Sequence, residues 1–243
     1  MMKRWPILVA MAVCPAAASA GPVKIQHDSK ALQFSYSWPA AAAASPALDK
    51  RFRAEAGKAY KGALGVALEN QKIYREQKRD GMQDFYSMEW SAAGHTPRLL
   101  SLQNELSTFT GGAHPNTGYN ALLWDRRASR EIGWMSLFRQ PGSFAALTRS
   151  AYCRALDKER AKRRQGEKLD LPDFNACPKY SELAIAPVDS NNDGRFDTIE
   201  YVASPYTAGP YAEGAYNVTL PVTSQLIAAI KPEFRNSFAR QRQ

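Results

Sequence analysis

The sequence is poor in cysteine and histidine, with only three of each in 243 residues. Three cysteines are too few for a disulfide-dense scaffold. Acidic residues are also in the minority, 23 Asp and Glu against 32 Lys and Arg, for a formal net charge of +9. Such an excess favours an anionic partner, although net charge says little about fold. With 44% hydrophobic and 23% charged residues, the composition is globular and excludes a disordered or fibrous chain.

Motifs of several enzyme classes are missing. There is no His-Glu-x-x-His metal motif, no Gly-x-Ser-x-Gly nucleophile elbow and no phosphate-binding loop, and the histidines are His27, His95 and His114. No segment reaches the roughly 20 consecutive apolar residues that a membrane-spanning helix needs. The sequence therefore carries few signals of catalysis and none of a membrane span.

The first twenty residues have the organisation of a secretory signal peptide. Lys3 and Arg4 precede an apolar run over 5–13, and Ala18 and Ala20 frame a small-residue cleavage site. We therefore expect cleavage after Ala20 and a periplasmic or secreted protein without a transmembrane segment.

Cleavage would leave 223 residues with a net charge of +7 and two cysteines. Lipoprotein processing at Cys14 is the less favoured alternative, because Val13 stands where that processing needs a small residue. In an exported chain we expect Cys153 and Cys177 to form a disulfide, since that compartment lets the bond persist. Two buried free thiols are the alternative.

Hydrophobic periodicity predicts both strands and helices. Strands are expected at 23–38, 85–90, 99–110, 119–124, 182–188, 196–204 and 216–220. Ser45 and Pro46 are typical of a helix start, and they begin a long predicted helix over 46–78. A second helix is predicted over 143–164, with Leu147 on its apolar face, and a final helix from Ser224. The pattern predicts an α+β fold, in which one long and one medium helix pack on an antiparallel sheet.

We expect a single domain over 21–243, with subregions 21–110 and 111–243 as a finer division. Basic residues concentrate in the two predicted helices: residues 50–79 hold nine Lys or Arg and three Glu, and residues 153–168 hold seven basic and three acidic residues. Two interpretations stay open. In the first, both helices present basic outer faces to solvent. In the second, they form a platform for anionic envelope polymers. Nucleic acid is not an expected partner of an exported chain.

The strongest local motif resembles a twelve-position calcium loop. It has oxygen side chains at positions 1, 3, 5 and 9, glycine at position 6, a backbone carbonyl at position 7 and glutamate at position 12. The residues at those ligand positions are Asp189, Asn191, Asp193, Arg195, Asp197 and Glu200. Strand-like flanks argue against a true EF-hand. The motif predicts a structural Ca²⁺ site, and the alternative is a metal-free hairpin turn, which the same residue types stabilise.

A second motif is a glycine-rich turn between predicted strands, which contains Gly111, Gly112, His114 and Asn116. About 95 residues later follows a tyrosine-rich stretch over 205–214, and then Val-Thr-Leu-Pro at 218–221. Together these segments resemble the extracytoplasmic domain family of the anti-sigma factor RsiV, which also accompanies the peptidoglycan deacetylase PdaC. The resemblance covers most of the mature chain.

The resemblance implies an α+β, extracytoplasmic, non-catalytic recognition module. In RsiV such a domain binds lysozyme, but a chain with net charge +7 is poorly suited to a cationic protein. The resemblance and the motifs select candidate ligand-binding residues and no catalytic ones: Gly111, Gly112, His114, Asn116, Tyr206, Tyr211 and Glu213. Tyr206 and Tyr211 are candidates for stacking on sugar rings, and core or turn packing is their alternative role.

We therefore expect a secreted or periplasmic module that binds a cell-wall glycan or an envelope protein. Two alternatives stay open. One is an envelope hydrolase that uses His114 with a nearby carboxylate, Asp125 or Glu213. The other is a calcium-stabilised inhibitor of an envelope enzyme.

Overall fold

The structure, a computed structural model, describes residues 21–167 and 169–241. The expected signal peptide and Cys14 lie outside these residues. Six strands form the larger sheet in the order β1-β2-β3-β4-β5-β6. They are β1 (Val23–Asp28), β2 (Leu32–Trp38), β3 (Asp84–His95), β4 (Leu99–Phe109), β5 (Asn116–Asp125) and β6 (Arg130–Ile132). The predicted meander of β3, β4 and β5 is confirmed, because both pairings are antiparallel.

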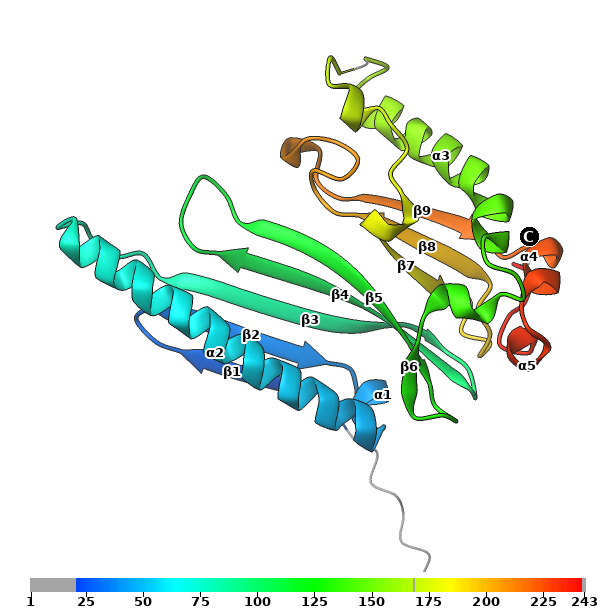
Figure 1. Ribbon diagram of the computed structural model, residues 1–243, viewed down its shortest axis with the longest axis horizontal. Coiled ribbons are helices and arrows are strands. Elements are labelled where there is room, and N and C mark those ends of the chain that lie inside the picture. The colour runs from blue at the N-terminus through cyan, green and yellow to red at the C-terminus, as the bar shows by residue number, and fades with distance from the viewer. Residues whose placement is uncertain (1–20, 168, 242–243) are drawn as a thin grey trace, which may run out of the picture.

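A long helix covers one face of this sheet (Figure 1). Between β2 and β3 the chain forms α1 (Ala40–Ala43) and then the long helix α2 (Pro46–Glu76). This helical connection crosses over the sheet, so that β2 and β3 pair in parallel. The predicted start of α2 at Pro46 is confirmed. Leu48, Phe52 and Ala56 recur at helical spacing and are buried against aromatic residues of the sheet. Packing on the sheet, rather than helix propensity, therefore stabilises this glycine-containing helix.

A smaller antiparallel sheet forms a second layer. It consists of β7 (Leu183–Val188), β8 (Thr198–Ala203) and β9 (Tyr216–Pro221), in that order. The medium helix α3 (Ser143–Arg163) packs on its outer face, and α4 (Ser224–Ala229) and α5 (Pro232–Arg235) follow at one end (Figure 1). Short 3₁₀ helices are η1 (Trp134–Leu137), η2 (Pro172–Phe174), η3 (Tyr180–Glu182) and η4 (Tyr211–Glu213).

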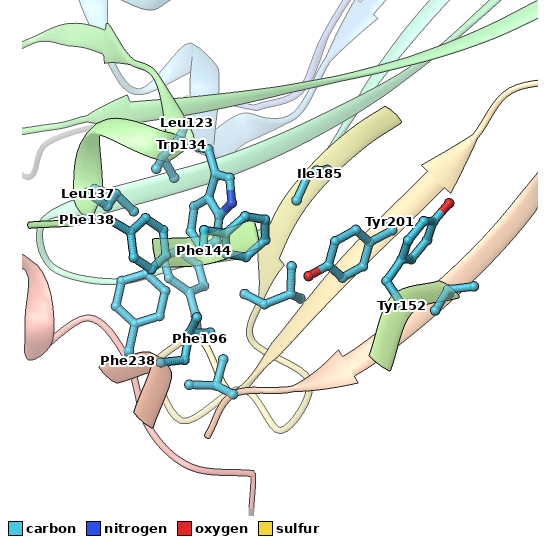
Figure 2. Packing of buried hydrophobic residues seen from close by; sticks show 14 of the residues in the cluster. Leu123, Trp134, Leu137, Phe138, Phe144, Tyr152, Ile185, Phe196, Tyr201 and Phe238 are labelled. Carbon is cyan, nitrogen blue, oxygen red and sulfur yellow. The ribbon is translucent and has the colours of Figure 1, made fainter. Parts of the chain in front are cut away.

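The second layer has its own aromatic core (Figure 2). Tyr152 of α3 stacks on Tyr201 of β8 with ring centroids 4.9 Å apart, and Trp134 meets Phe144 edge to face at 5.1 Å. Leu99 and Leu123 of the large sheet join the same core. The mixed α+β fold that the sequence predicts is thus confirmed, with the strands divided between two sheets.

Three details differ from the sequence-based prediction. Strand β3 runs on through a bulge to His95, beyond the predicted end at residue 90, because β4 continues to pair with it. Leu147 is 40% exposed, and Thr148, Tyr152 and Leu156 join Phe144 in the buried stripe of α3. The C-terminal segment is two short helices, because Pro232 cannot continue α4 and instead opens α5.

The two layers touch closely at Gly94 in the β3 bulge. The Asp189 N–H donates to the Ala93 carbonyl at 3.3 Å, and a Cβ on Gly94 would lie 2.7 Å from the Asp189 nitrogen. We expect Gly94→Ala to lower the free energy of unfolding by roughly 2 kcal/mol, since backbone must move to admit the methyl group. Urea unfolding measures this.

The control is Gly57→Ala on α2, where an added Cβ has nothing within 4 Å. It should stabilise the protein by up to about 1 kcal/mol through helix propensity. An unchanged unfolding midpoint for Gly94→Ala would show that the layers do not depend on this contact.

Among the described residues, no helix is both long and apolar enough to span a membrane.

Candidate functional site

A cleft of about 410 Å³ lies between the two sheets. One wall comes from β3, β4 and β5, and the other from β7, β8 and the start of β9. Most of its lining side chains are carboxylates, amides and hydroxyls. The lining consists of Glu89, Ser91, Gln103, Asn104, Glu105, Tyr119, Asn120, Ala184, Glu200, Val202, Ala215 and Asn217.

Strand register brings three of these residues into one row. Glu89 of β3 lies opposite Glu105 of β4, and Glu105 lies opposite Tyr119 of β5. The Tyr119 hydroxyl donates to Glu105 Oε2 at 3.1 Å. Burial and the Glu105 carboxylate raise the pKa of Tyr119, which keeps its hydroxyl protonated and donating. The row therefore presents two carboxylates and a phenol to the cleft.

The opposite wall adds a third carboxylate. Glu200 of β8 accepts a hydrogen bond from the side-chain amide of Asn217 on β9. On its other side the small sheet buries Ile199 and Tyr201 in the core. This alternation, with period two, is what directs Glu200 to the cleft.

Three aromatic residues connect the two layers beyond the cleft; we call His114, Tyr206 and Tyr211 the aromatic bridge. The His114 ring stacks on Tyr211 with centroids 3.6 Å apart, and its Nε2 lies 3.3 Å from the Tyr206 hydroxyl. Nδ1 of His114 is 2.9 Å from the Pro115 carbonyl, which can only accept. A proton on Nδ1 therefore leaves Nε2 to accept from Tyr206.

The bridge joins the β4–β5 turn to the loop between β8 and β9. The turn contains Gly111 and Gly112, with φ of 96° and 108°, and Asn116 begins β5. Tyr206 is 55% exposed and has φ of 69°, which is uncommon for a side chain of this size. Such strain tends to occur at functional sites. The structure thus brings His114, Tyr206 and Tyr211 together, with Tyr206 exposed and the other two half-buried.

Glu213 lies apart from the bridge. It forms a two-pronged ion pair with Arg164, the C-cap residue of α3, at 2.8 and 2.9 Å, and its Oε2 also accepts from Tyr216. Its role is to fasten the tyrosine-rich loop to α3. Asp125, the other carboxylate considered beside His114, pairs with Arg98 at 3.0 Å and accepts two backbone N–H groups.

Both carboxyls are held in the ionised form. The hydrogen bond from Arg164 lowers the pKa of Glu213 and outweighs the opposing effect of burial. Burial raises the pKa of Asp125, but hydrogen bonds from Arg98 and the backbone more than offset it, so that the net shift is downward. Neither group has the raised pKa that suits a general acid.

The Glu213 ion pair should make stability depend on pH. Because the folded-state pKa is lowered, its contribution is full above the ordinary glutamate pKa of about 4.3 and is lost as pH falls through the folded value. Glu213→Gln should therefore melt below wild type at pH 7, with the gap closing toward pH 3. Thermal melts across this range measure it. Exposed Glu76→Gln is the control, and a gap for Glu213→Gln that does not change with pH would contradict the prediction.

The predicted calcium loop hydrogen bonds to itself. Asp189 accepts from the Asp193 and Gly194 N–H groups at 3.1 and 2.9 Å, and Asp197 accepts from the backbone and hydroxyl of Ser190. Gly194 has φ of 81°, as the predicted sharp turn requires. Asn191 and Asp193 form Asx turns, because each side chain accepts from the N–H two residues further on, at 2.9 and 3.1 Å.

The twelfth position does not fit a closed metal site. Glu200 bonds to Asn217 and lines the cleft, and the described part of the chain contains no group of three or more His, Cys, Asp or Glu residues placed to hold a metal. Any Ca²⁺ would have to be held by Asp189, Asn191, Asp193, the Arg195 carbonyl and Asp197. If the loop binds Ca²⁺, the melting temperature should rise when Ca²⁺ is added and fall when a chelator is added. Equal melting temperatures under the two conditions would refute the calcium site.

The predicted disulfide is present: Cys153 of α3 is bonded to Cys177.

Residues 25–117 match the family model described as Deacetylase PdaC. The fold resembles a DUF3298 family protein from Pseudomonas aeruginosa PAO1, with TM-score 0.55, 16% identity, and coverage of 91% of this chain and 98% of the other. It also resembles a DUF3298 family member from Bacteroides fragilis NCTC 9343, with TM-score 0.52, 15% identity, and coverage of 89% and 96%. No curated protein matches the sequence significantly. The resemblance to the RsiV and PdaC type of domain is thereby confirmed: the chain has the DUF3298 fold, with a PdaC-type segment at residues 25–117.

Proposed function

We propose that this protein is a non-catalytic recognition module of the cell envelope, and that it binds a glycan in the cleft between its two sheets. The cleft carries the proposal. Its volume of about 410 Å³ lies within the usual range of ligand pockets, and its walls offer amide, carboxylate and hydroxyl groups to a ligand rich in hydroxyls. Outside the cleft lining, exposed Tyr206 of the aromatic bridge offers a further ring face.

The contacts of His114 support a role without catalysis. Its ring nitrogens face the Pro115 carbonyl and the Tyr206 hydroxyl, while Asp125 and Glu213 are engaged by Arg98 and Arg164. A histidine that acts as general base is usually oriented by a carboxylate and faces a nucleophile or water. The arrangement favours ring stacking and positioning of the loop over proton transfer.

The signal peptide predicted from the sequence and the Cys153–Cys177 disulfide support an extracytoplasmic location. The resemblance to the RsiV and PdaC type of domain supports the same location. Glycans are abundant in the cell envelope, and they are therefore the proposed class of ligand for the cleft.

Co-sedimentation with purified peptidoglycan tests the proposal. Wild type should pellet with the polymer, and Ser91→Trp, which fills the cleft from an exposed position, should reduce binding at least about tenfold. Ser150→Trp on the outer side of α3 is the matched control and should bind like wild type.

Failure of wild type to pellet, or equal binding by Ser91→Trp, would refute recognition in the cleft. Release of soluble fragments that His114→Ala abolishes would instead establish the hydrolase.

A further inference from the structure

We infer that the outer face of α2 is a docking surface for a membrane, and that its partner is a bilayer rich in anionic phospholipid. The face points away from the larger sheet, on which the opposite side of the helix packs (Figure 1). We call it the α2 ridge. Its exposed residues follow one another at helical spacing: Lys58, Lys61, Gly65, Leu68, Lys72 and Arg75.

The ridge carries cations that the fold does not use. Residues 58–79 hold six Lys or Arg and two Glu. Among the described residues, Lys58, Lys61 and Arg75 have no ion-pair partner, and Lys72 has only a long contact of 3.8 Å with exposed Glu69. Each cation near an anionic bilayer adds to the affinity for it. The charge of the ridge therefore complements an anionic surface.

Exposed apolar side chains lie among these cations. Of the eight large hydrophobic side chains that are exposed in the described part of the chain, four lie within residues 66–82: Val66, Leu68, Ile73 and Met82. Leu68, on the ridge itself, is 55% exposed. The Gln71 side chain donates to the Met82 carbonyl at 2.7 Å, which holds Met82 beside the helix.

The apolar side chains distinguish between two anionic partners. A polymer that offers only charge would leave Leu68 and Val66 in water. A bilayer interface offers both anionic headgroups and an apolar boundary, and helices that lie in it combine Lys or Arg with exposed apolar residues. The combination on α2 therefore favours a bilayer over a soluble polyanion.

Glycines on the exposed side of α2 give independent support. A Cβ added to Gly57, Gly62 or Gly65 would have nothing within 4 Å, so the packing of the fold does not require glycine at these positions. Glycine weakens a helix relative to alanine. Without side chains there, a flat surface can approach the helix, while Lys58, Lys61 and Leu68 extend toward it.

The helix α3 is also basic but lacks this combination. Arg160 and Arg163 donate to loop carbonyls, and Arg164, at its C-cap, pairs with Glu213. Among the described residues of α3, Leu147 is the one exposed large hydrophobic side chain, and it lies near the opposite end of the helix. The exposed lysines of α3 therefore serve as a control for charge alone.

Docking through the ridge would leave the cleft free. Trp90 of β3 stacks on Phe52 of α2, whereas its neighbour Glu89 lines the cleft. Because successive residues of a strand point to opposite faces, α2 and the cleft lie on opposite sides of the larger sheet. The inference does not depend on glycan binding, and both surfaces can be occupied at once.

Co-sedimentation with vesicles tests the inference. The probes are vesicles of phosphatidylglycerol and phosphatidylcholine in equal parts, and vesicles of phosphatidylcholine alone. Wild type should pellet with the anionic vesicles only, and less as salt rises. Lys58→Ala/Lys61→Ala should lower the affinity at least about tenfold. Val66→Gln/Leu68→Gln should lower it at least about fivefold.

Matched variants control for charge and for apolar exposure elsewhere. Lys158→Ala/Lys162→Ala removes two exposed lysines from α3, and Leu171→Gln removes another exposed leucine. Both should bind like wild type. The ridge positions are exposed and their replacements favour helix, so these variants should melt like wild type. A loss of binding without a loss of stability then reports on the surface.

Three results would overturn the inference. Wild type might pellet equally with both kinds of vesicle or with neither. An equal loss for the α3 control would show that net charge alone drives binding. Unchanged binding by Val66→Gln/Leu68→Gln, together with displacement of wild type by soluble dextran sulfate, would replace the bilayer with an anionic polymer. Co-sedimentation with peptidoglycan, through the cleft, should be the same for wild type and the ridge variants in every case.

Discussion

Arg160→Ala is expected to lower the free energy of unfolding by about 3 kcal/mol, which corresponds to a fall in melting temperature of about 6–12 °C for a chain of this size. Arg160 of α3 is only 3% exposed. Its guanidinium donates to the carbonyls of Ala208, Asn175 and Ala176 at 2.8–3.1 Å. The substitution removes the donor of the Asn175 and Ala176 carbonyls, leaves Ala208 with only the longer bond from Arg164 at 3.3 Å, and opens a cavity within the helix packing.

Arg154→Ala is the matched control, because Arg154 is exposed and, within the described part of the chain, its side chain hydrogen bonds to Ser150 of the same helix alone. It should change stability by less than about 0.5 kcal/mol. If Arg160→Ala loses no more stability than the control, Arg160 does not hold the segments around Asn175 and Ala208 to α3.

Removal of the disulfide is expected to cost about 3 kcal/mol. Cys153 and Cys177 are 24 residues apart, and closing a loop of this length restricts the unfolded chain by roughly that amount. The double variant Cys153→Ala/Cys177→Ala should therefore unfold at a clearly lower denaturant concentration. Wild type under reducing conditions should match it, and the variant should not respond to reductant.

The disulfide and Arg160 should not act independently, because both attach the same segment to α3. Arg149 adds a third attachment through hydrogen bonds to the carbonyls of Cys177 and Pro178. Combining Cys153→Ala/Cys177→Ala with Arg160→Ala should give a loss that differs from the sum by more than about 0.5 kcal/mol. Strict additivity would show that the segment is held at separate points.

Long periodic segments were the most predictable part of the fold. The start of α2 follows from Ser45 and Pro46, and the β3–β5 meander follows from alternating apolar residues. The division into two sheets does not follow from periodicity, because strands that pack face to face and strands that pair share the same pattern. The misjudged stripe of α3 has a similar cause: its buried face contains Thr148 and Arg160, whose polar groups find specific partners.

The candidate site was only partly visible in the sequence. The resemblance pointed to His114, Tyr206 and Tyr211, which lie together in the fold. It also pointed to Glu213, which instead forms an ion pair with Arg164. Of the cleft residues the sequence singled out Glu200 alone, as a metal ligand. The signal of the others is the polar alternation of Ser101, Gln103, Glu105 and Ser107 in a strand whose other face holds Leu100, Leu102 and Leu106, a pattern equally typical of a strand facing water. Only the second sheet turns that face into a cleft.

Glycan recognition in the cleft is tested most directly by backbone amide NMR during titration with a soluble peptidoglycan fragment. Binding in the cleft should make the amide signals of Glu105, Tyr119 and Asn217 shift together and saturate with one affinity, because these residues line opposite walls of the same cleft. Shifts confined to Lys58, Lys61 and their neighbours on the exposed face of α2, with the cleft signals unchanged, would contradict it.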